Sequence, residues 1–220
     1  MPSNQSLRYV LPFIVFLAFL AGSAYLPAPA VWEYPLRVGA MAAILWFYSR
    51  SVIDLRVRNW AGTLALGVAV FAIWIAPDVL WPHYRDSILF QNQLTGKIAS
   101  SLPEVLRTSW IVLLFRTIRA ALIVPIVEEL FWRGWMMRWL INPEIEKVPL
   151  GAYAANAFWI TAALFASEHG PYWEVGLVAG IAYNWWMIRT KSLGDCILAH
   201  AVTNALLSAY VIVYGQWQYW

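Results

Sequence analysis

The chain has 220 residues, of which 61% are hydrophobic and only 12% charged, with a formal net charge of +3. Soluble domains carry roughly a quarter charged residues, so this composition excludes a disordered chain and argues against an ordinary soluble globule. The excess of positive charge is too small to predict a nucleic-acid partner. Its one cysteine, Cys196, allows no internal disulfide and no zinc site of paired cysteines.

Hydrophobic runs follow one another along the first half of the chain, and about 20 residues suffice for a helix to span a bilayer. The first run covers residues 9–26 and stops at two prolines. A cleavable signal peptide is the alternative there, but further hydrophobic runs follow. Residues 36–48 and 60–80 form the next two, and a polar loop then extends to about residue 103. The bilayer is therefore a predicted partner of the chain.

The second half begins with a long run of helical period, residues 104–141, which Pro125 either divides or kinks. Three more apolar stretches follow at about 152–167, 173–188 and 193–214, and neither strand alternation nor an internal repeat is evident. We predict an all-α, polytopic transmembrane bundle of seven or eight helices. It forms a single domain over residues 1–220, with accessory helices in 1–103 and the charged, motif-bearing helices in 104–220.

Basic residues of the N-terminal segment and first polar loop favour a cytoplasmic N-terminus. They are Arg8, Arg50, Arg56 and Arg58. Counting residues 104–141 as one crossing also places Arg189 and Lys191 inside, whereas two crossings place them outside. The tendency of inner loops to be basic thus favours one long, bent element.

A first polar cluster lies inside this long run. A charged side chain at the bilayer centre costs on the order of 2.5–3.5 kcal/mol, so it needs a partner or a polar cavity. Glu129 and Arg133 are four residues apart and can pair on one helical face. Glu128 lies about 100° around the helix and points elsewhere. Two carboxylates in different environments can take different roles; a helix-end ion cluster at the lipid surface is the alternative.

Two further clusters occur on later helices. Phe165 and His169 are four residues apart, as are His200 and Asn204, so each pair shares a helical face. A helix-capping histidine and an interhelical hydrogen bond are the simpler explanations of these pairs. A Cys196–His200 nucleophile is conceivable, but no third orienting group accompanies it. All three clusters together favour one polar cavity.

The order and spacing of these residues resemble the CPBP family of intramembrane proteases, which includes the CAAX prenyl endoproteases. The family pattern is matched by Glu128-Glu129-x-x-x-Arg133, Phe165-x-x-x-His169 and His200-x-x-x-Asn204. The resemblance extends over about residues 116–214. Length and layout are also similar to the subgroup found in bacteria with exosortase sorting systems, which implies a multi-pass protein of the bacterial inner (cell) membrane.

The resemblance implies an intramembrane endopeptidase that hydrolyses a peptide bond without a covalent acyl-enzyme. Glu128 would be the general base, and His169 would help to hold and activate a water. His200 and Asn204 would stabilise the oxyanion. The other two residues of the pattern would position the site: Glu129 and Arg133. The expected partner is a membrane-anchored protein or peptide substrate.

Cofactors and other function classes remain open. No cofactor is expected, and no His-Glu-x-x-His motif occurs, but two histidines and a glutamate could bind zinc, so a metalloprotease is the second choice. Some members of the family act as non-catalytic membrane scaffolds or immunity-type proteins, and intramembrane Glu and His also form ion or proton relays. The complete residue set argues against a non-catalytic scaffold, and the absence of a dedicated metal-ligand motif favours the metal-independent glutamate protease.

Overall fold

The computed structural model describes residues 4–22 and 29–220, which form helices and connecting loops and contain no β-strand. This confirms the all-α prediction. The helices are α1 (Asn4–Ala21), α2 (Ala30–Ile44), α3 (Trp60–Leu80), α4 (Trp110–Ile118), α5 (Val124–Glu129), α6 (Met137–Trp139), α7 (Ala155–Ser167), α8 (Trp173–Thr190) and α9 (Leu193–Tyr214). The end of the first predicted run, residues 23–26, lies outside the described residues.

The long charged run is one bent element rather than two helices. Helices α4, α5 and α6 are joined without a break by two π-helical segments, Arg119–Ile123 and Leu130–Met136. Pro125 lacks an N–H group and its ring crowds the carbonyl four residues earlier, and the wider π turn immediately before it accommodates both effects. The helix begins at Trp110, later than predicted, because Glu104–Leu106 forms only a short 3₁₀ turn.

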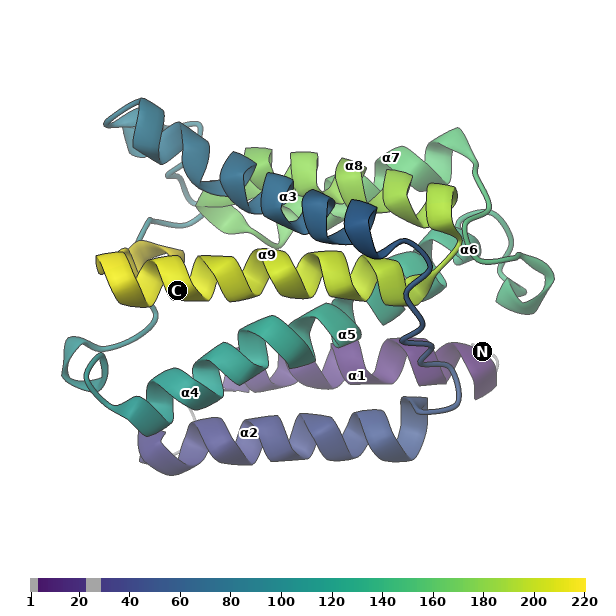
Figure 1. Cartoon of the computed structure of the whole chain (residues 1–220), viewed down its shortest axis with the longest axis horizontal. Helices are drawn as coiled ribbons and strands as arrows, with labels where there is room; N and C mark the ends of the chain where they lie inside the picture. Colours follow the sequence, from purple (N-terminus) through teal and green to yellow (C-terminus); the bar gives the residue numbers. More distant parts are fainter. Residues whose placement is uncertain (1–3, 23–28) are drawn as a thin grey trace.

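The helices run roughly side by side in a layered bundle (Figure 1). Helix α9 lies in the middle, with α3, α7 and α8 on one side of it and α4–α5, α1 and α2 on the other. Helix α3 packs directly along α9, and α7 along α8. The first of these contacts is close because Gly67 faces α9, where a Cβ atom would stand only 2.6 Å from the carbonyl oxygen of Ala199.

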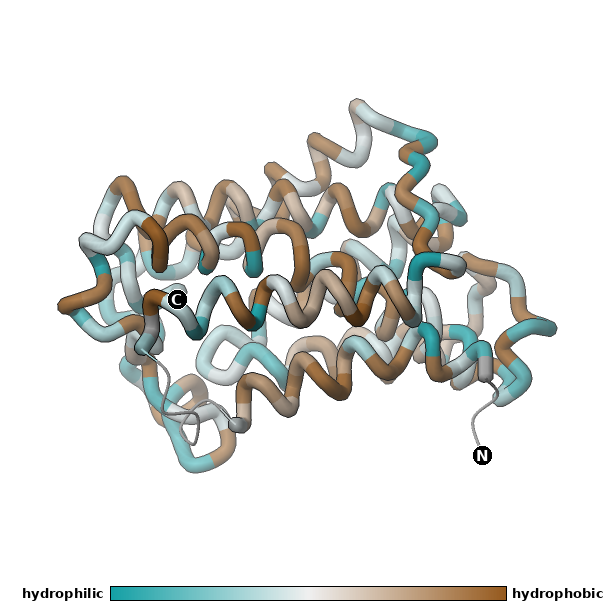
Figure 2. The backbone as a smooth tube through the Cα atoms, turned by 90° about the horizontal axis from the view of Figure 1, so that it is seen from below, coloured by the Kyte–Doolittle hydropathy of each residue, from teal (hydrophilic) through white to brown (hydrophobic). Residues whose placement is uncertain are grey.

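Within residues 4–22 and 29–220, three helices are long and apolar enough to cross a membrane: Trp60–Leu80, Trp110–Trp139 and Leu193–Tyr214. Along the backbone tube of Figure 2, the brown, hydrophobic positions lie mostly in the helices, and the teal, hydrophilic positions are frequent in the connecting loops. Large apolar side chains also point outward from the middle of several helices. Examples are Ile14, Val68, Ile73, Leu122, Ile160 and Val178. Monomeric soluble proteins rarely expose so much apolar surface, so these faces fit contact with lipid.

The bundle has two ends that we name by their loops. The basic end carries the loops of residues 50–59, 140–154 and 191–192, and it is tied together by hydrogen bonds from the backbone N–H groups of Arg58 and Asn59 to the Asp195 carboxylate. The tail end carries the loop of residues 81–103 and the C-terminal residues 215–220. The Ser101 N–H donates to the Trp220 carbonyl and joins these two segments, and the Tyr219 hydroxyl donates to Asp78 on α3.

Candidate active site

Glu128 and Glu129 are the last two residues of α5, where the α-helix passes into a π-helical segment. π turns inside α-helices are frequent at functional sites. Both carboxylates are buried, but their environments differ. Glu129 is completely enclosed, whereas Glu128 keeps 8% of its surface accessible. The Oε2 atom of each accepts no hydrogen bond from any described residue. The two adjacent glutamates therefore point into different surroundings, as predicted.

Arg133 is held behind the site by an unusually complete set of contacts. Its Nη1 donates to Glu129 Oε1 at 3.0 Å, Nε donates to Asn184 Oδ1 at 3.0 Å and Nη2 donates to the Gly180 carbonyl at 3.3 Å. The guanidinium also lies 4.5 Å from the centre of the Phe165 ring. A buried cation is tolerated only when paired and hydrogen-bonded, and this one satisfies both conditions. The predicted Glu129–Arg133 pair is confirmed.

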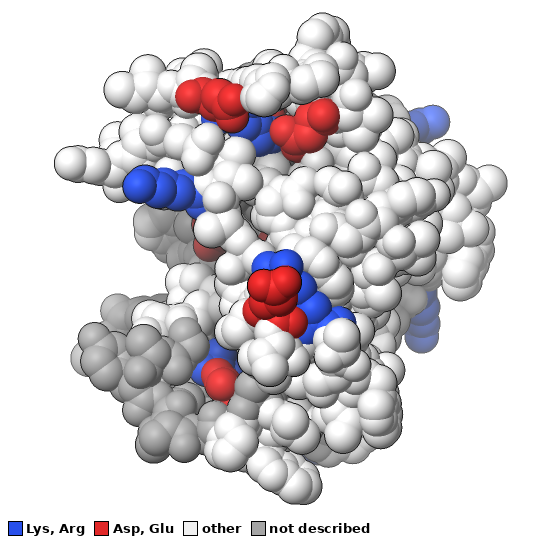
Figure 3. Space-filling view, turned by 90° about the vertical axis from the view of Figure 1, so that its left-hand side faces the viewer, with Lys and Arg blue, Asp and Glu red and all other residues white. Residues whose placement is uncertain are grey.

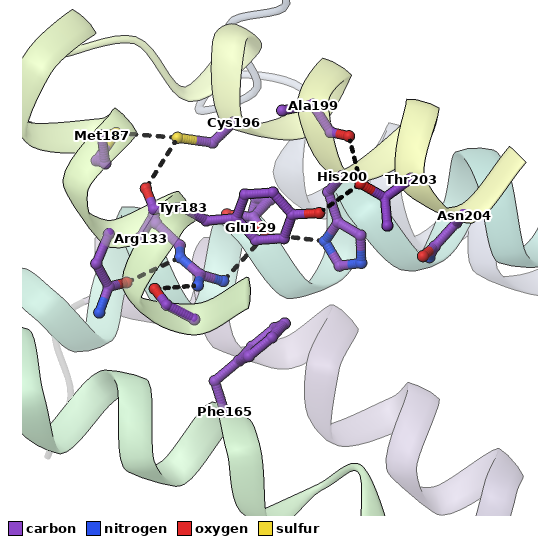
Figure 4. A network of polar contacts seen from close by, with 12 residues as sticks. Glu129, Arg133, Phe165, Tyr183, Met187, Cys196, Ala199, His200, Thr203 and Asn204 are labelled. Carbon is purple, nitrogen blue, oxygen red and sulfur yellow. Dashed lines mark hydrogen bonds and ion pairs between the residues drawn. The ribbon is translucent and has the colours of Figure 1, made fainter. Parts of the chain in front are cut away.

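Glu129 also contacts the second histidine. The same Oε1 that accepts from Arg133 lies 2.9 Å from His200 Nδ1 (Figure 4). A carboxylate can only accept in this contact, so Nδ1 carries the proton and Nε2 is left for the cavity. The His200 ring is further fixed by stacking on Tyr183, with centroids 5.2 Å apart and ring planes 21° apart. Glu129 thus orients His200 while it neutralises Arg133.

The first histidine is positioned by the end of its helix. Helix α7 ends at Ser167, and a 3₁₀ turn at Gly170–Tyr172 follows, so the helix ends where the predicted apolar stretch of about 152–167 ends. His169 Nδ1 lies 2.7 Å from the Phe165 carbonyl oxygen, so it must donate there and Nε2 remains free. The Phe165 ring packs against the imidazole at 4.7 Å, and Gly176 of α8 backs it closely enough that a Cβ would come within 3.1 Å.

A cavity of about 190 Å³ lies between these groups. Four of the six predicted residues line it: Glu128, His169, His200 and Asn204. The Asn204 amide donates one N–H to the Ala120 carbonyl at 2.9 Å, which leaves its second N–H unused by that contact. The cavity therefore brings together a carboxylate, two imidazole Nε2 atoms and an amide from α5, α9 and the turn after α7.

The expectation that all six residues line one cavity was wrong for Glu129 and Arg133. Both are fully enclosed and lie behind the wall that Glu128 and His200 form. The physical reason is charge: each neutralises the other, and a pair this well satisfied gains nothing from contact with the cavity. Their place fits positioning of the site. The conceivable Cys196 nucleophile also fails, because its thiol is buried against the Tyr183 carbonyl and Met187 rather than facing the cavity.

Several residues of the cavity wall were not anticipated. Tyr183 donates to Thr203 Oγ1 at 2.8 Å, and Thr203 in turn donates to the Gly67 carbonyl of α3. Trp74 of α3 contacts the His169 ring edge to face at 5.1 Å. The tail end contributes further aromatic lining residues: Tyr219 and Trp220. A tyrosine or threonine within an apolar helix carries no spacing signal of its own, so sequence could not single these residues out.

Helices outside the motif region hold the glutamate-bearing helix from behind. Phe13 of α1 stacks on Phe131 with ring centroids 4.0 Å apart, and it meets Trp132 edge to face. Tyr9 lies against Gly134, where a Cβ would approach the ring to 2.9 Å. This packing fixes the π-helical turn that follows Glu129.

Among the described residues, no group of three or more His, Cys, Asp or Glu side chains is arranged to hold a metal ion.

Comparison with known proteins supplies one match. Residues 109–206 match the family model described as "Type II CAAX prenyl endopeptidase Rce1-like". No curated protein and no solved structure matches the chain. The matched segment contains all three motifs, and the family suggests endopeptidase activity within a membrane. Residues 109–206 are therefore similar to the type II CAAX prenyl endopeptidases, as the resemblance of the three motifs predicted.

Proposed function

We propose that this protein is an intramembrane endopeptidase that uses Glu128 to activate a water molecule. The observation that supports this most directly is the cavity that Glu128 lines together with His169 and His200, two histidines whose Nδ1 atoms are engaged and whose Nε2 atoms are left free. A buried carboxylate in a low-polarity cavity is a stronger base than one in water. The cavity also provides a place for water next to a bond that lipid would keep dry.

The proposed reaction balances its protons within this set of groups. Glu128 accepts one proton of the water as the oxygen attacks the peptide carbonyl, and the Nε2 of His169 accepts a hydrogen bond from the other proton. The free N–H of Asn204 donates to the developing oxyanion, and His200 would donate as well in the form in which its Nε2 also carries a proton. Glu128 then delivers its proton to the leaving amine, and no covalent acyl-enzyme forms.

We propose that the described helices cross the membrane seven times, with α4–α6 as one crossing, and that the basic end faces the cytoplasm. Its basic residues outnumber its acidic ones. The basic residues are Arg8, Arg50, Arg56, Arg58, Arg138, Lys147, Arg189 and Lys191, against Asp54, Glu144, Glu146 and Asp195. Basic loops favour the inner side. The cavity then opens toward the outer side, where Tyr219 and Trp220 line it. The location implied is a bacterial inner membrane.

Metal independence is part of the proposal. In the two histidines of the cavity, Nδ1 donates to protein oxygen atoms, an arrangement that suits hydrogen bonding to water as well as ligation. The test is turnover of the purified protein after chelation. Turnover that persists supports the glutamate mechanism; turnover that is lost and returns on adding stoichiometric zinc contradicts it and favours the metalloprotease.

Comparison of protein termini in membranes tests the activity itself. Membranes from cells that make the wild-type protein, the Glu128→Gln variant or neither are compared by mass spectrometry of N- and C-terminal peptides. We expect new termini from membrane-anchored proteins only with the wild type. If the variant is inserted at normal levels and yields the same termini, or restores the wild-type phenotype of cells that lack the protein, a non-catalytic scaffold is the better account.

A further inference from the structure

A second polar pocket, of about 360 Å³, lies at the tail end between α1, α2 and α4. It is separate from the candidate active site and lies mostly outside the family match. Three arginines line it: Arg37, Arg116 and Arg119. Its other polar lining residues are Glu33, Tyr34 and Ser101. Figure 3 looks onto this end of the molecule, where charged atoms form a few separate groups on a largely uncharged surface.

The charges of this pocket do not balance. Glu33 pairs with Arg37 and is the one carboxylate among the described lining residues. Arg116 finds only neutral partners, donating to the Tyr34 hydroxyl at 2.9 Å and to Ser101 Oγ at 2.5 Å. Arg119 lies 5.7 Å from the Tyr34 ring centre and makes no ion pair with the described residues. Three cations against one anion leave a local excess of about two positive charges.

Two of these arginines are buried and incompletely hydrogen-bonded. Arg37 is 7% exposed and Arg116 is 4% exposed. The Nε atom of each has no hydrogen-bond partner among the described residues. A buried charge left unpaired is costly, and guanidinium N–H groups are matched in geometry by the oxygens of a phosphate. The excess of positive charge in the pocket lining therefore points to an anionic ligand.

The depth of the pocket indicates where that anion comes from. Arg37 lies seven residues after the start of α2, and Arg116 lies six after the start of α4, so both are about 10 Å along their helices at 1.5 Å per residue. Exposed tryptophans near both helix starts, Trp32 and Trp110, mark the interfacial level. Long arginine side chains extend toward this level from inside the bilayer, which is where lipid phosphates lie.

We propose that this pocket binds the phosphate of an anionic phospholipid headgroup, with Arg37, Arg116 and Arg119 as the ligating cations. The pocket adjoins the candidate active site through two contacts. Ala120, which follows Arg119, lines the catalytic cavity, and the Trp220 ring lies 5.2 Å from the Arg116 guanidinium while also lining that cavity. A lipid bound here would stand next to the cavity mouth.

Lipid binding to the purified full-length chain tests the proposal without any measurement of proteolysis, so its outcome is independent of the proposed activity. The protein in neutral detergent is titrated with phosphatidylglycerol, phosphatidylcholine or inorganic phosphate, and retained lipid and thermal unfolding are measured. The test variant is Arg119→Gln, because this side chain makes no ion pair with the described residues. The control is Arg56→Gln, an exposed arginine at the basic end.

We expect phosphatidylglycerol to raise the unfolding temperature and to be retained, with at least about tenfold weaker binding in Arg119→Gln, unchanged binding in Arg56→Gln and partial recovery in Arg119→Lys. Equal stabilisation by inorganic phosphate, lost in the same variant, would support the anion site but assign it to free phosphate. No preference for phosphatidylglycerol or phosphate over phosphatidylcholine, or equal losses in Arg119→Gln and Arg56→Gln, would overturn the proposal.

Discussion

Glu128 and Glu129 are neighbours in sequence, but their carboxylates differ in burial and in ion pairing. Glu129 carries two charge-assisted hydrogen bonds, from Arg133 and His200, and is completely enclosed. Removing its charge leaves a buried guanidinium without its counter-ion, which typically costs several kcal/mol. Glu128 forms no ion pair with any described residue, whereas Glu129 forms two. If Glu128 is the base, as proposed, substitutions at these two adjacent positions should separate effects on stability from effects on catalysis.

The first prediction follows from this contrast. Glu129→Gln should lower the thermal unfolding temperature in detergent markedly and reduce insertion as well as turnover. Glu128→Gln should unfold close to the wild-type temperature. Circular dichroism or a tryptophan-fluorescence melt of both variants measures the difference. A Glu128→Gln protein that unfolds early beside a stable Glu129→Gln protein would mean that the two roles are assigned the wrong way round.

A second residue-scale prediction concerns Gly176, which backs the His169 ring. A Cβ at this position would come within 3.1 Å of the imidazole Cγ and Nδ1 atoms, so the ring must shift. Displacement of a catalytic group by part of an ångström can cost one to two orders of magnitude in rate. Gly176→Ala should therefore lower turnover about 10- to 100-fold with little loss of stability.

The matched control is Gly39→Ala in α2, where the added Cβ would meet nothing within 4 Å. Alanine is favoured over glycine inside a helix, so this variant should be as stable as the wild type or slightly more so, with unchanged turnover. Initial cleavage rates and melts of the two variants give the comparison. Equal rates for both would show that the position of His169 does not limit the reaction.

At the scale of elements, the turn that carries His169 is held by a residue from the loop of residues 81–103. Arg85 is buried and pairs with Asp78 of α3 and Glu174 of α8, and it donates to the Pro171 carbonyl at 2.8 Å. Burial alone would lower the pKa of Arg85, but its hydrogen bond to Glu174 and the charges of both carboxylates raise it overall. The loop thus joins α3, α8 and the turn next to His169.

Arg85→Gln should release this junction. It leaves two partly buried carboxylates without their cation, a loss on the order of 3–5 kcal/mol when a buried pair is broken, and it frees the turn after α7. We expect a lower unfolding temperature and reduced turnover. Arg56→Gln serves as control because its contact with Asp54 is exposed and 3.9 Å long, and such pairs contribute about 1 kcal/mol or less. Wild-type stability in Arg85→Gln would contradict the role of the loop.

For the whole molecule, the placement of charge predicts an orientation. The basic end should face the cytoplasm and the tail end the opposite side. In a chain whose buried Cys196 is replaced by serine, single cysteines are introduced as Lys97→Cys at the tail end and Lys147→Cys at the basic end. An impermeant maleimide should label the first in intact cells and the second only after permeabilisation. The reverse pattern would contradict the orientation and place the cavity mouth inside.

Sequence predicted the parts of the fold that depend on hydrophobic runs and short spacings. The apolar segments could be predicted from their hydrophobicity. The Glu129–Arg133 pair and the Phe165–His169 contact could be predicted because each depends on residues within about one helical turn. The π turns, the Glu129–His200 bond and the contribution of Phe13 were not. They depend on which helices pack against one another, and the sequences of uniformly apolar helices contain little information about that packing.

The most direct test of the central claim is the cleavage rate of purified protein in liposomes, in the presence of chelator, on a substrate identified by the comparison of membrane termini. The wild-type protein and Glu128→Gln are measured side by side after their melts have been shown to agree. We predict that the wild type cleaves at a single peptide bond and that Glu128→Gln is slower by roughly two to four orders of magnitude. Equal rates in the two proteins would contradict the role of Glu128 as the base that activates water.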